Sequence, residues 1–556
     1  MNVSDLLLTI LADHGVEHLF GIPGDAINDV MDAIRRSDRM RFIQVRHEEA
    51  GAFAASAQAK LTGKLAVCMG TAGPGAIHLL NGLYDARMDH APVLAITGQV
   101  ATGFIGTSYH QEVDTHRLFA DVSCFNETVT TPDQLPALMQ EACRAAIAHR
   151  SVAHLSLPTN ISNLRVKLDT DQLKTFSTPG AILPNPADCR AAAALLQAAE
   201  RPTILAGIGC ADARDELIGL ATHIQAPIVR TLRAKDFIDD DDPMCVGGAG
   251  LLGGAPGVAA LADCDVLLMA GTDFPYHDFY PDHAKVIQID HEGTRVGRRK
   301  AVNIGLIGDA KPTLQALRDQ LEPVAKRSFY DHSAKAMERW RKRRDALEAG
   351  DDTPIRPQRL LAEVSSCAPD DAIFLIDTGT STAWSARHLK VGADQRFTLS
   401  GGLASMAFAL SGSIGAQLAF PGRTVIAIAG DGAFGMLMAD FVTAVRYELP
   451  INVVVLRNEK LAFITLEQEA SGLPEFGTEL ANPDYAAFAT DCGGLGIAVD
   501  KPEDIRPALE RAFADPRPAL IDVSVDPDAL ILPPKIKLGQ VAKFSVAKVR
   551  EALEKW

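Results

Sequence analysis

An aspartate between two glycines, followed further along by an asparagine, could together hold a metal ion. Asp431 lies in the turn Gly430-Asp431-Gly432 after an apolar run, and Asn458 ends the next apolar run. Loops at the carboxyl ends of parallel strands form the ligand crevice of an open sheet, where glycines let the backbone approach a phosphate. A carboxylate and an amide oxygen are ligands that magnesium prefers. The pattern favours a magnesium clamp on a diphosphate over a turn with an Asx cap.

The elements that must position these residues are alternating strands and helices. Continuous Val, Ile and Leu runs separated by helical patterns indicate parallel sheets that are covered on both faces. We therefore predict an α/β fold with three doubly wound parallel-sheet domains in series. The predicted strands are 65–70, 92–98, 153–158, 202–209, 226–232, 265–271, 285–290, 372–379, 424–432, 451–458 and 519–525.

Length and charge narrow the class of protein. The 556 residues are enough for several domains, and the formal net charge of -16 argues against a nucleic-acid partner. The apolar N-terminal segment carries Asp5 and Asp13 and lacks a basic start, so it predicts an amphipathic helix rather than a signal peptide. No apolar run is long enough to span a membrane. The nine cysteines contain no CxxC pair, which fits reduced thiols in a cytoplasmic protein.

Two polar stretches, 161–182 and 326–355, predict connections between domains. The predicted domains are therefore 1–160, 183–325 and 355–530, followed by a tail at 531–556. The second connection carries a basic cluster that predicts either a solvated helix face or a patch for a partner. The cluster consists of Arg339, Arg341, Lys342, Arg343 and Arg344.

Longer blocks of sequence resemble a known family. The GDG turn with its later asparagine is similar to the signature of thiamine-diphosphate enzymes. The blocks "FGIPGDAINDVMDA", "VRHEEAGAFAASAQAKLTGKLAVCMGTAGPGAIHLLNGLYDARMDHAPVLAITGQ", "HQEVDTHRLFADVS", "SGGLASMAFALSGSIGAQLA" and "PPKIKLGQVAKFS" resemble its pyruvate oxidase and pyruvate:quinone dehydrogenase branch. The resemblance implies that 1–160 binds the pyrimidine of the cofactor, 183–325 is an FAD-binding-like central domain, and 355–530 binds the diphosphate and Mg²⁺.

The resemblance implies a role for individual residues around thiamine diphosphate. Glu48, rather than Glu49, corresponds to the glutamate that hydrogen-bonds the aminopyrimidine ring and activates the cofactor. Met406 matches the apolar residue over which the cofactor folds. The metal ligands implied are Asp431, Asn458 and the backbone carbonyl of Lys460, although Arg457 departs from the family pattern. Further contacts to thiamine diphosphate are implied for Gly24, Thr380, Ser381, Leu403, Gly430, Gly432, Ala433 and Ile464.

The resemblance also implies FAD in the central domain, with a degenerate scaffold layer as the alternative. A literal GxGxxG runs from Gly248 to Gly253, but the strand, turn and helix that it needs are not evident, so no separate NAD site is predicted. The residues implied to contact FAD are Gly207, Gly209, Gly250, Leu251, Gly271, Thr272, Asp273, Phe274, Asp290 and Asp309.

The residues implied at the substrate separate oxidation from carboligation. Besides Glu48, they are His110, Gln111, Phe463 and Glu467. Acetolactate synthases usually have tryptophan where this chain has Glu467, which favours an oxidase. His110 replaces a phenylalanine that both branches commonly have, which leaves the keto acid and the electron acceptor open.

The expected reaction is oxidative decarboxylation of pyruvate to acetate or acetyl phosphate and CO₂, with electrons passed through FAD to quinone or oxygen. The alternatives are a carboligase of the acetolactate synthase type with a non-redox FAD, and a non-catalytic cofactor-binding scaffold. The resemblance implies a homo-oligomer, a tetramer built from dimers, in which Glu48 and Asp431 meet across two subunits. Four apolar residues near the C-terminus have the spacing of a short amphipathic helix: Val546, Val549, Leu553 and Trp556. Such a helix allows weak contact with the inner membrane surface or docking on the protein itself. The expected location is cytoplasmic.

Overall fold

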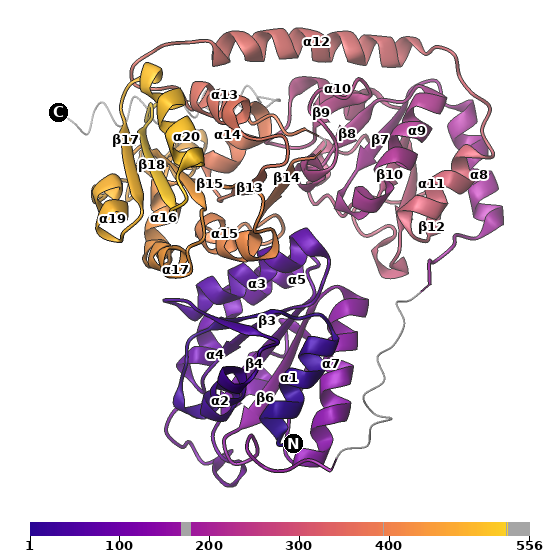
Figure 1. The fold of residues 1–556 in the computed structure, drawn as a ribbon. Coiled ribbons are helices and arrows are strands. Elements are labelled where there is room, and N and C mark those ends of the chain that lie inside the picture. The colour runs from indigo at the N-terminus through magenta and orange to yellow at the C-terminus, as the bar shows by residue number, and fades with distance from the viewer. Residues whose placement is uncertain (168–179, 393, 530, 532–556) are drawn as a thin grey trace.

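The computed structural model describes residues 1–167, 180–392, 394–529 and 531, which form three α/β domains in series (Figure 1). Each domain contains one six-stranded sheet, and the strand pairings within all three sheets are parallel. The predicted fold class is therefore confirmed. The amphipathic segment predicted near the C-terminus lies outside the described residues.

The first domain has the strand order β2-β1-β3-β4-β6-β5. Its N-terminal helix buries apolar side chains such as Leu7 and Ile10 in the core, which agrees with the predicted amphipathic helix. The strands are β1 (His18–Gly21), β2 (Arg41–Gln44), β3 (Ala66–Gly70), β4 (Val93–Gln99), β5 (Ser123–Thr128) and β6 (Val152–Pro158). The helices are α1 (Val3–Asp13), α2 (Asn28–Arg36), α3 (Glu48–Thr62), α4 (Pro74–His78), α5 (Leu80–Met88), α6 (Thr115–Leu118) and α7 (Leu135–His149).

The central domain has the order β12-β11-β10-β7-β8-β9. A helix of 21 residues, α12 (Ser328–Glu348), then leads to the third domain along one edge of the molecule (Figure 1). The strands are β7 (Pro202–Ala206), β8 (Ile228–Arg230), β9 (Cys245–Gly248), β10 (Val266–Ala270), β11 (Lys285–Asp290) and β12 (Ile304–Ile307). The helices are α8 (Pro186–Ala198), α9 (Arg214–Ile224), α10 (Ala255–Asp263) and α11 (Ala310–Arg318).

The third domain has the order β14-β13-β15-β16-β18-β17. The strands are β13 (Ile373–Ile376), β14 (Arg396–Leu399), β15 (Val425–Gly430), β16 (Asn452–Arg457), β17 (Leu495–Val499) and β18 (Ala519–Ser524). The helices are α13 (Pro357–Cys367), α14 (Thr380–His388), α15 (Phe408–Ala419), α16 (Asp431–Leu437), α17 (Phe441–Arg446), α18 (Ala462–Ala470), α19 (Tyr485–Asp491) and α20 (Ile505–Ala514).

Two helices rich in small residues join the first and third domains. A Cβ atom at Gly415 of α15 would collide with the carbonyl oxygen of Ala54 in α3, so glycine is what lets the helices approach. Beside this contact the rings of Phe53 and Phe408 pack edge to face, with centroids 5.9 Å apart. Both rings belong to one apolar cluster that continues through the two domains. This packing fixes the orientation of α3 and of the residues at its start.

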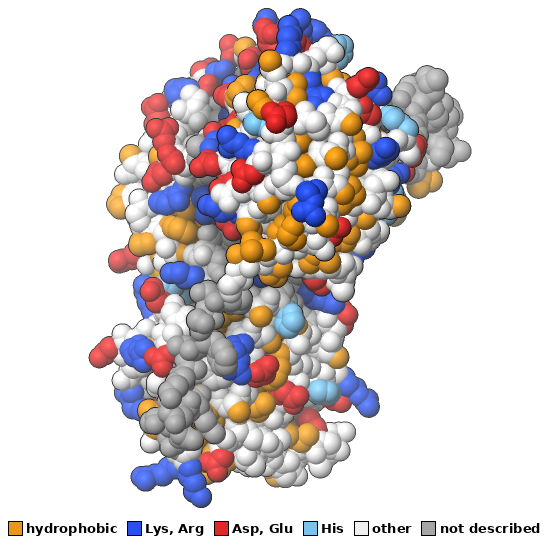
Figure 2. All heavy atoms as spheres, turned by 90° about the vertical axis from the view of Figure 1, so that its right-hand side faces the viewer, with side chains coloured by type: hydrophobic (Ala, Val, Ile, Leu, Met, Phe, Trp, Pro, Cys, Tyr) orange, Lys and Arg blue, Asp and Glu red, His pale blue; other side chains and the backbone are white. Residues whose placement is uncertain are grey.

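Charged side chains of both signs are interspersed on the face of the molecule shown in Figure 2. The basic cluster on α12 is partly structural. Arg341 donates to the carbonyl oxygen of Asp240, and the buried Arg344 pairs with Glu348 at 3.3 Å. Arg341 and Arg344 thus contact the protein itself, so the predicted solvated helix face accounts for only part of this cluster.

Within the described residues, no helix is long and apolar enough to cross a membrane, and the nine cysteines are all unpaired.

Candidate active site

Glu48 lies in the first turn of α3, and its neighbours hold that turn in place. The helix begins after His47, whose Nδ1 accepts a hydrogen bond from the amide of Glu49 at 3.2 Å. The strand-to-helix connection is also tied to the third domain, because Asp440 accepts from the amide of Arg46 at 2.8 Å. The Glu48 side chain is only 9% exposed. Packing between domains therefore presents one shielded carboxyl group at a helix N-terminus.

The turn at 71–75 gathers the other first-domain residues around Glu48. A Cβ atom at Gly75 would lie 3.3 Å from Glu48 Oε1, and one at Gly73 would lie 3.1 Å from the Cβ of Gln111. Gly24 packs so closely on Thr71 that an added Cβ would collide with it. The structure therefore brings Gly24, Glu48 and Gln111 to the same carboxyl edge of the sheet.

His110, next to Gln111, is exposed, and no side-chain partner is recorded for it among the described residues. Sequence reasoning did not single out His78, whose Nδ1 lies 2.9 Å from Glu48 Oε2. The signal was present in the "GAIHLL" block, but only the fold shows that α4 brings this imidazole to Glu48.

Asp431 and Asn458 meet at the carboxyl edge of the third sheet, where β15 and β16 end side by side. Asp431 Oδ2 accepts hydrogen bonds from the amides of Asn458 at 3.1 Å and Glu459 at 2.6 Å. The Asn458 side-chain oxygen accepts from the amide of Lys460 at 3.1 Å. One carboxylate and one amide oxygen from neighbouring strand ends are a donor set that fits a hard cation such as Mg²⁺.

Two residues that the sequence did not indicate complete this corner. The Asn482 side-chain amide donates to Asp431 Oδ2 at 2.9 Å, and the Tyr485 hydroxyl donates to the Asp431 carbonyl at 3.1 Å. Burial raises the pKa of Asp431, while the backbone amides of Glu459 and its neighbours partly offset that effect. These contacts hold the carboxylate in one orientation, as a metal ligand requires.

Asp377 connects two loops that carry predicted cofactor contacts. Its buried carboxyl accepts from the amides of Thr378 at 2.9 Å, Phe408 at 3.4 Å and Ala409 at 3.3 Å. Burial raises the pKa of Asp377 to about 7, because these amides only partly compensate for the loss of water. Its position ties the 377–382 loop to the start of α15.

The segment before α15 carries Leu403 and Met406, which are both half-buried. Ala404 and Ala407 on either side of Met406 adopt φ values of 57° and 71°, a left-handed region that costs a residue with a side chain about 1 kcal/mol or more. The Cε of Met406 lies 3.6 Å from where a Cβ at Gly432 would be. The structure therefore brings Met406 to the GDG turn.

Open space faces the turns that would hold a diphosphate. A Cβ atom at Gly379 or Gly430 would meet nothing within 4 Å, and Gly379 has a φ of 126°, which favours glycine. Ala433 follows in the buried first turns of α16. The Thr380 hydroxyl has no recorded partner among the described residues, whereas the Ser381 hydroxyl donates to the Asp377 carbonyl at 2.9 Å. The Ser381 hydroxyl is therefore engaged within the protein in this structure.

The predicted substrate residues of the third domain share one helix. Phe463, Ile464 and Glu467 lie in the first two turns of α18, and the side chains of Ile464 and Glu467 are exposed. Ile464 is 45% exposed, which is unusual for a large apolar side chain. Across the described residues, no hydrogen bond or ion pair joins this helix or Asp431 to Glu48. The first and the third domain therefore each carry part of the predicted catalytic residues.

The residues predicted to contact FAD all lie at the carboxyl edge of the central sheet. Gly207 packs against Gly271 so closely that an added Cβ would collide, and Gly209 donates its amide to the Gly271 carbonyl at 2.9 Å. Gly250 adopts a φ of 80° beside the ring of Phe274. The loops of β7, β9 and β10 therefore converge where a ligand binds in folds of this kind. Thr272 and Leu251 lie in the same loops.

The three aspartates predicted to contact FAD differ in the hydrogen bonds and ion pairs that their carboxylates form. Asp290 accepts the amide of Glu292 at 3.0 Å, and burial raises the pKa of Asp290. Asp309 accepts the amide of Ile182 at 2.9 Å, and Asp273 forms an ion pair with Arg299 at 2.7 Å. Among the described residues, the Asp290 carboxylate is thus the one of the three that contacts only its own loop, including Nδ1 of His291 at 3.5 Å.

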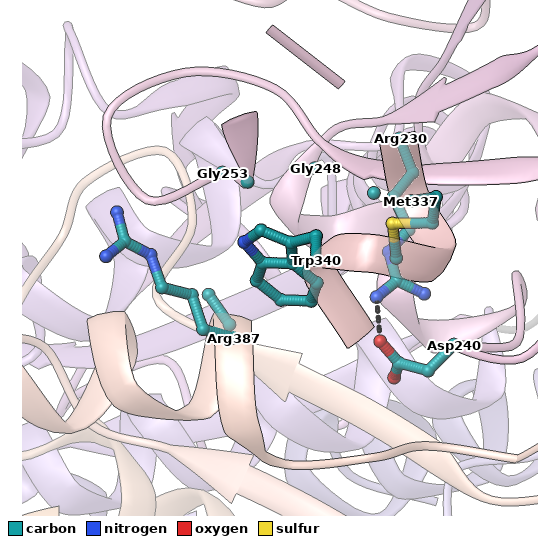
Figure 3. Close-up of a pocket in the computed structure, with 10 residues that line it drawn as sticks. Arg230, Asp240, Gly248, Gly253, Met337, Trp340 and Arg387 are labelled. Carbon is teal, nitrogen blue, oxygen red and sulfur yellow. Dashed lines mark hydrogen bonds and ion pairs between the residues drawn. The ribbon is translucent and has the colours of Figure 1, made fainter. Parts of the chain in front are cut away.

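The GxGxxG segment follows a strand and precedes a helix, since β9 ends at Gly248 and α10 begins at Ala255. The expectation that this context is missing is wrong; two of the four residues of β9 are glycines, which hid the strand. The cavity beside it, lined by Arg230, Trp340 and Arg387, has a volume of about 20 Å³ (Figure 3). That is room for roughly one water molecule, so this cavity is not itself a dinucleotide site.

Comparison with known proteins agrees with the division into three domains. Models of thiamine pyrophosphate enzymes match in order: the N-terminal TPP binding domain over residues 1–118, the central domain over 189–317, and the C-terminal TPP binding domain over 377–523.

Relatives match over nearly the full chain. A putative thiamine pyrophosphate-containing protein of Bacillus subtilis is 41% identical, covering 98% of this chain and 95% of that protein. A pyruvate oxidase of Lactiplantibacillus plantarum is 36% identical, covering 96% and 90%. A probable acetolactate synthase large subunit of Methanococcus aeolicus is 30% identical, covering 97% and 95%. The chain therefore belongs to the thiamine pyrophosphate enzyme family.

Proposed function

We propose that this enzyme carries out thiamine-diphosphate- and FAD-dependent oxidative decarboxylation of pyruvate, with acetate or acetyl phosphate and CO₂ as products and quinone or oxygen as the final acceptor. The observation that carries the proposal is the arrangement of three loop sets, one at the carboxyl edge of each sheet: Glu48 in the first, the glycine loops and Asp290 in the second, and Asp431 with Asn458 in the third. The 36% identity to a pyruvate oxidase supports this choice of reaction.

Each residue would have a definite task. Asp431 and Asn458 hold Mg²⁺ and through it the diphosphate, and the Lys460 carbonyl supplies a third protein ligand. Glu48 holds and moves the proton that activates the cofactor. When bound, thiamine diphosphate supplies the electron sink for loss of CO₂, and FAD accepts two electrons. Gln111, Phe463 and Glu467 surround and orient the keto acid and exclude water from it.

A second copy of the chain would complete the site. The loop before Gln111 exposes a stacked pair of rings, Phe104 and Tyr109, and the segment after α18 exposes Phe476 at 85%. Exposed large apolar side chains beside two half-sites favour burial against another subunit. We propose a dimer-built oligomer in which the first domain of one copy faces the third domain of the other.

Carboligation is the second candidate function. Acetolactate synthases of several organisms match 94% to 97% of this chain and are 30% to 31% identical to it. His110 has no recorded partner in the described residues, so its imidazole is available to a second, polar keto acid in the pocket. In that case FAD would take no part in electron transfer.

Product analysis distinguishes the two candidates. Purified protein is supplied with thiamine diphosphate, Mg²⁺, FAD, pyruvate, inorganic phosphate and an artificial two-electron acceptor, and the products are separated. The proposal predicts acetate or acetyl phosphate in an amount equal to the acceptor reduced. Acetolactate formed without reduction of the acceptor would establish carboligation instead, and no product at all would favour a non-catalytic scaffold.

A further inference from the structure

A single recorded hydrogen bond reaches the Glu48 carboxylate, and it comes from an imidazole. His78 Nδ1 lies 2.9 Å from Glu48 Oε2, and the described residues provide no other hydrogen-bond partner for this side chain. A carboxylate oxygen without a hydrogen can only accept, so this hydrogen bond then requires the hydrogen to be on Nδ1 of His78. Oε1 remains beside the Gly75 backbone, 3.3 Å from where a Cβ would be. The two carboxylate oxygens are therefore different: one is held and one is available.

A second histidine fixes the plane of the first. The rings of His47 and His78 stack with centroids 4.4 Å apart and planes 28° apart. His47 Nδ1 accepts the Glu49 amide, so in the neutral ring its hydrogen is on Nε2. His47, Glu48 and His78 are close enough to form a metal site. However, the lone pair of His47 is already used by the helix cap. The group is better described as an ordered chain of hydrogen bonds and stacked rings.

We propose that His78 is a positioning residue that selects which oxygen of Glu48 meets the aminopyrimidine ring of the cofactor. Donation from Nδ1 holds Oε2 and turns Oε1 toward the ligand. The last side-chain torsion of a glutamate otherwise has a broad range of angles. Without this donor, the Glu48 carboxylate would therefore adopt orientations in which it cannot share a proton with the aminopyrimidine ring. A hydrogen bond to an ionised acceptor is strong enough to suppress that rotation. The inference rests on the cofactor-activating task proposed for Glu48.

The test measures cofactor activation without any substrate. Protein saturated with thiamine diphosphate and Mg²⁺ is mixed with deuterium oxide, and exchange of the thiazolium C2 proton is followed by quenched-flow NMR. His78→Ala removes the donor and is expected to slow exchange about tenfold, the size of effect that loss of one hydrogen bond to a charged group produces. The dissociation constant for thiamine diphosphate is expected to stay within about threefold, because His78 does not itself hold the cofactor.

Two further variants separate geometry from general damage. His78→Asn places an N–H close to the position of Nδ1 and is expected to retain most of the exchange rate. His78→Gln places its N–H near the position of Nε2 and is expected to be as slow as His78→Ala. His149→Ala, at an exposed histidine in the last turn of α7, is the matched control and should exchange at the wild-type rate. If His78→Ala does not fold, the exchange rates of His78→Asn and His78→Gln are compared with each other and test the inference.

Wild-type exchange in His78→Ala, or equal rates for Asn and Gln, would overturn the inference. Glu48→Gln, measured in the same series, tests the underlying assumption: if it exchanged at the wild-type rate, the task of Glu48 would be wrong, whatever His78 does. A cofactor-free readout is the nitrogen spectrum of histidine-labelled protein, in which His78 should carry its hydrogen on Nδ1. A hydrogen found on Nε2 of His78 would also contradict the proposal.

Discussion

At the scale of single residues, the buried carboxyl of Asp377 makes stability depend on pH. The pKa of Asp377 is raised to about 7 in the folded protein by burial, whereas an aspartate in the unfolded chain has its ordinary value of 3.8. Between these values the folded state keeps a proton that the unfolded chain releases, so this contribution to stability is lost as pH rises. The difference amounts to about 4 kcal/mol at most.

The variant Asp377→Asn tests this effect, because asparagine cannot ionise. We expect wild type to lose thermal stability relative to Asp377→Asn as the pH rises from about 4 to about 7, the range between the unfolded and folded pKa values. The measurement is the difference between the two melting temperatures at each pH. A difference that stays constant, or that changes in favour of wild type at high pH, would contradict a neutral Asp377 in the fold.

Local motifs indicated only part of the candidate site. Asp431 and Asn458 could be placed together because each follows an apolar strand, and the structure joins them by a hydrogen bond. Asn482, Tyr485 and His78 could not be placed, because they reach the site from helices or loops whose approach depends on the whole fold. The sequence around Asn482 and Tyr485 carries no chemical pattern, and the "GAIHLL" block around His78 does not by itself indicate a contact with Glu48. The ligand roles of all these residues stay predictions.

At the scale of elements, the strands that the sequence revealed are those inside the sheets. Missed strands include both edges of every sheet, namely β2 and β5, β9 and β12, β14 and β17, together with the interior strand β1. Edge strands such as β2 and β5 are only partly buried, so they need not be continuous Val, Ile and Leu runs. The segment SCFNET of β5 and the segment RFIQ of β2 illustrate this. The fold class could be predicted without them, because the interior strands define the parallel sheet.

The turn before α14 makes a prediction at this scale. Gly379 has a φ of 126° and a ψ of -150°, a region that is essentially restricted to glycine, while the space around it is open. We expect Gly379→Ala to lose roughly 1–3 kcal/mol of stability through backbone strain and to bind thiamine diphosphate more weakly. Melting temperature and titration calorimetry check the two effects.

Gly422→Ala is the control for that variant. A Cβ at Gly422 also meets nothing within 4 Å, and the φ of Gly422 is not positive. It should leave both stability and cofactor binding unchanged. Equal behaviour of the two alanine variants would show that the conformation of Gly379 is not required.

At the scale of the whole molecule, one carboxylate joins all three domains. Asp89 of the first domain pairs with Lys60 at 2.7 Å and with Arg233 of the central domain at 3.3 Å. It also accepts the amides of Gly401 at 2.9 Å and Gly402 at 2.8 Å in the third domain. Burial alone would raise the pKa of Asp89, but Arg233 and Lys60 outweigh it and lower the value to about 2.

Among the described residues, removing this carboxylate leaves Arg233 without an ion-pair partner and leaves Lys60 paired with Asp85 alone. Asp89→Ala is expected to lose about 3–5 kcal/mol of stability, since breaking a buried ion pair strands the opposite charge. It should also weaken cofactor binding, because Gly401 and Gly402 begin the segment that carries Met406. Asp121→Ala, at an exposed partner of Arg87, is the control and should melt near wild type. Similar melting temperatures for both variants would contradict the importance of the junction.

The proposed dimer predicts that two inactive variants recover activity when their subunits are exchanged. Glu48→Gln and Asp431→Asn should each be inactive, but mixing and exchanging their subunits creates dimers with one site that carries both changes and one that carries neither. Random mixing in equal amounts should restore about a quarter of wild-type activity. No recovery after proven subunit exchange would mean that Glu48 and Asp431 act within the same chain.

The central claim is that decarboxylation of pyruvate delivers electrons to bound FAD, and anaerobic mixing tests it most directly. Protein reconstituted with thiamine diphosphate, Mg²⁺ and FAD is mixed with pyruvate without oxygen while the flavin absorbance is recorded and CO₂ is counted. The account predicts that the flavin bleaches, that one CO₂ is released for each FAD reduced, and that Glu48→Gln bleaches at least about a hundredfold more slowly. Release of CO₂ with acetolactate and an oxidised flavin, or failure of the protein to bind FAD, would contradict it.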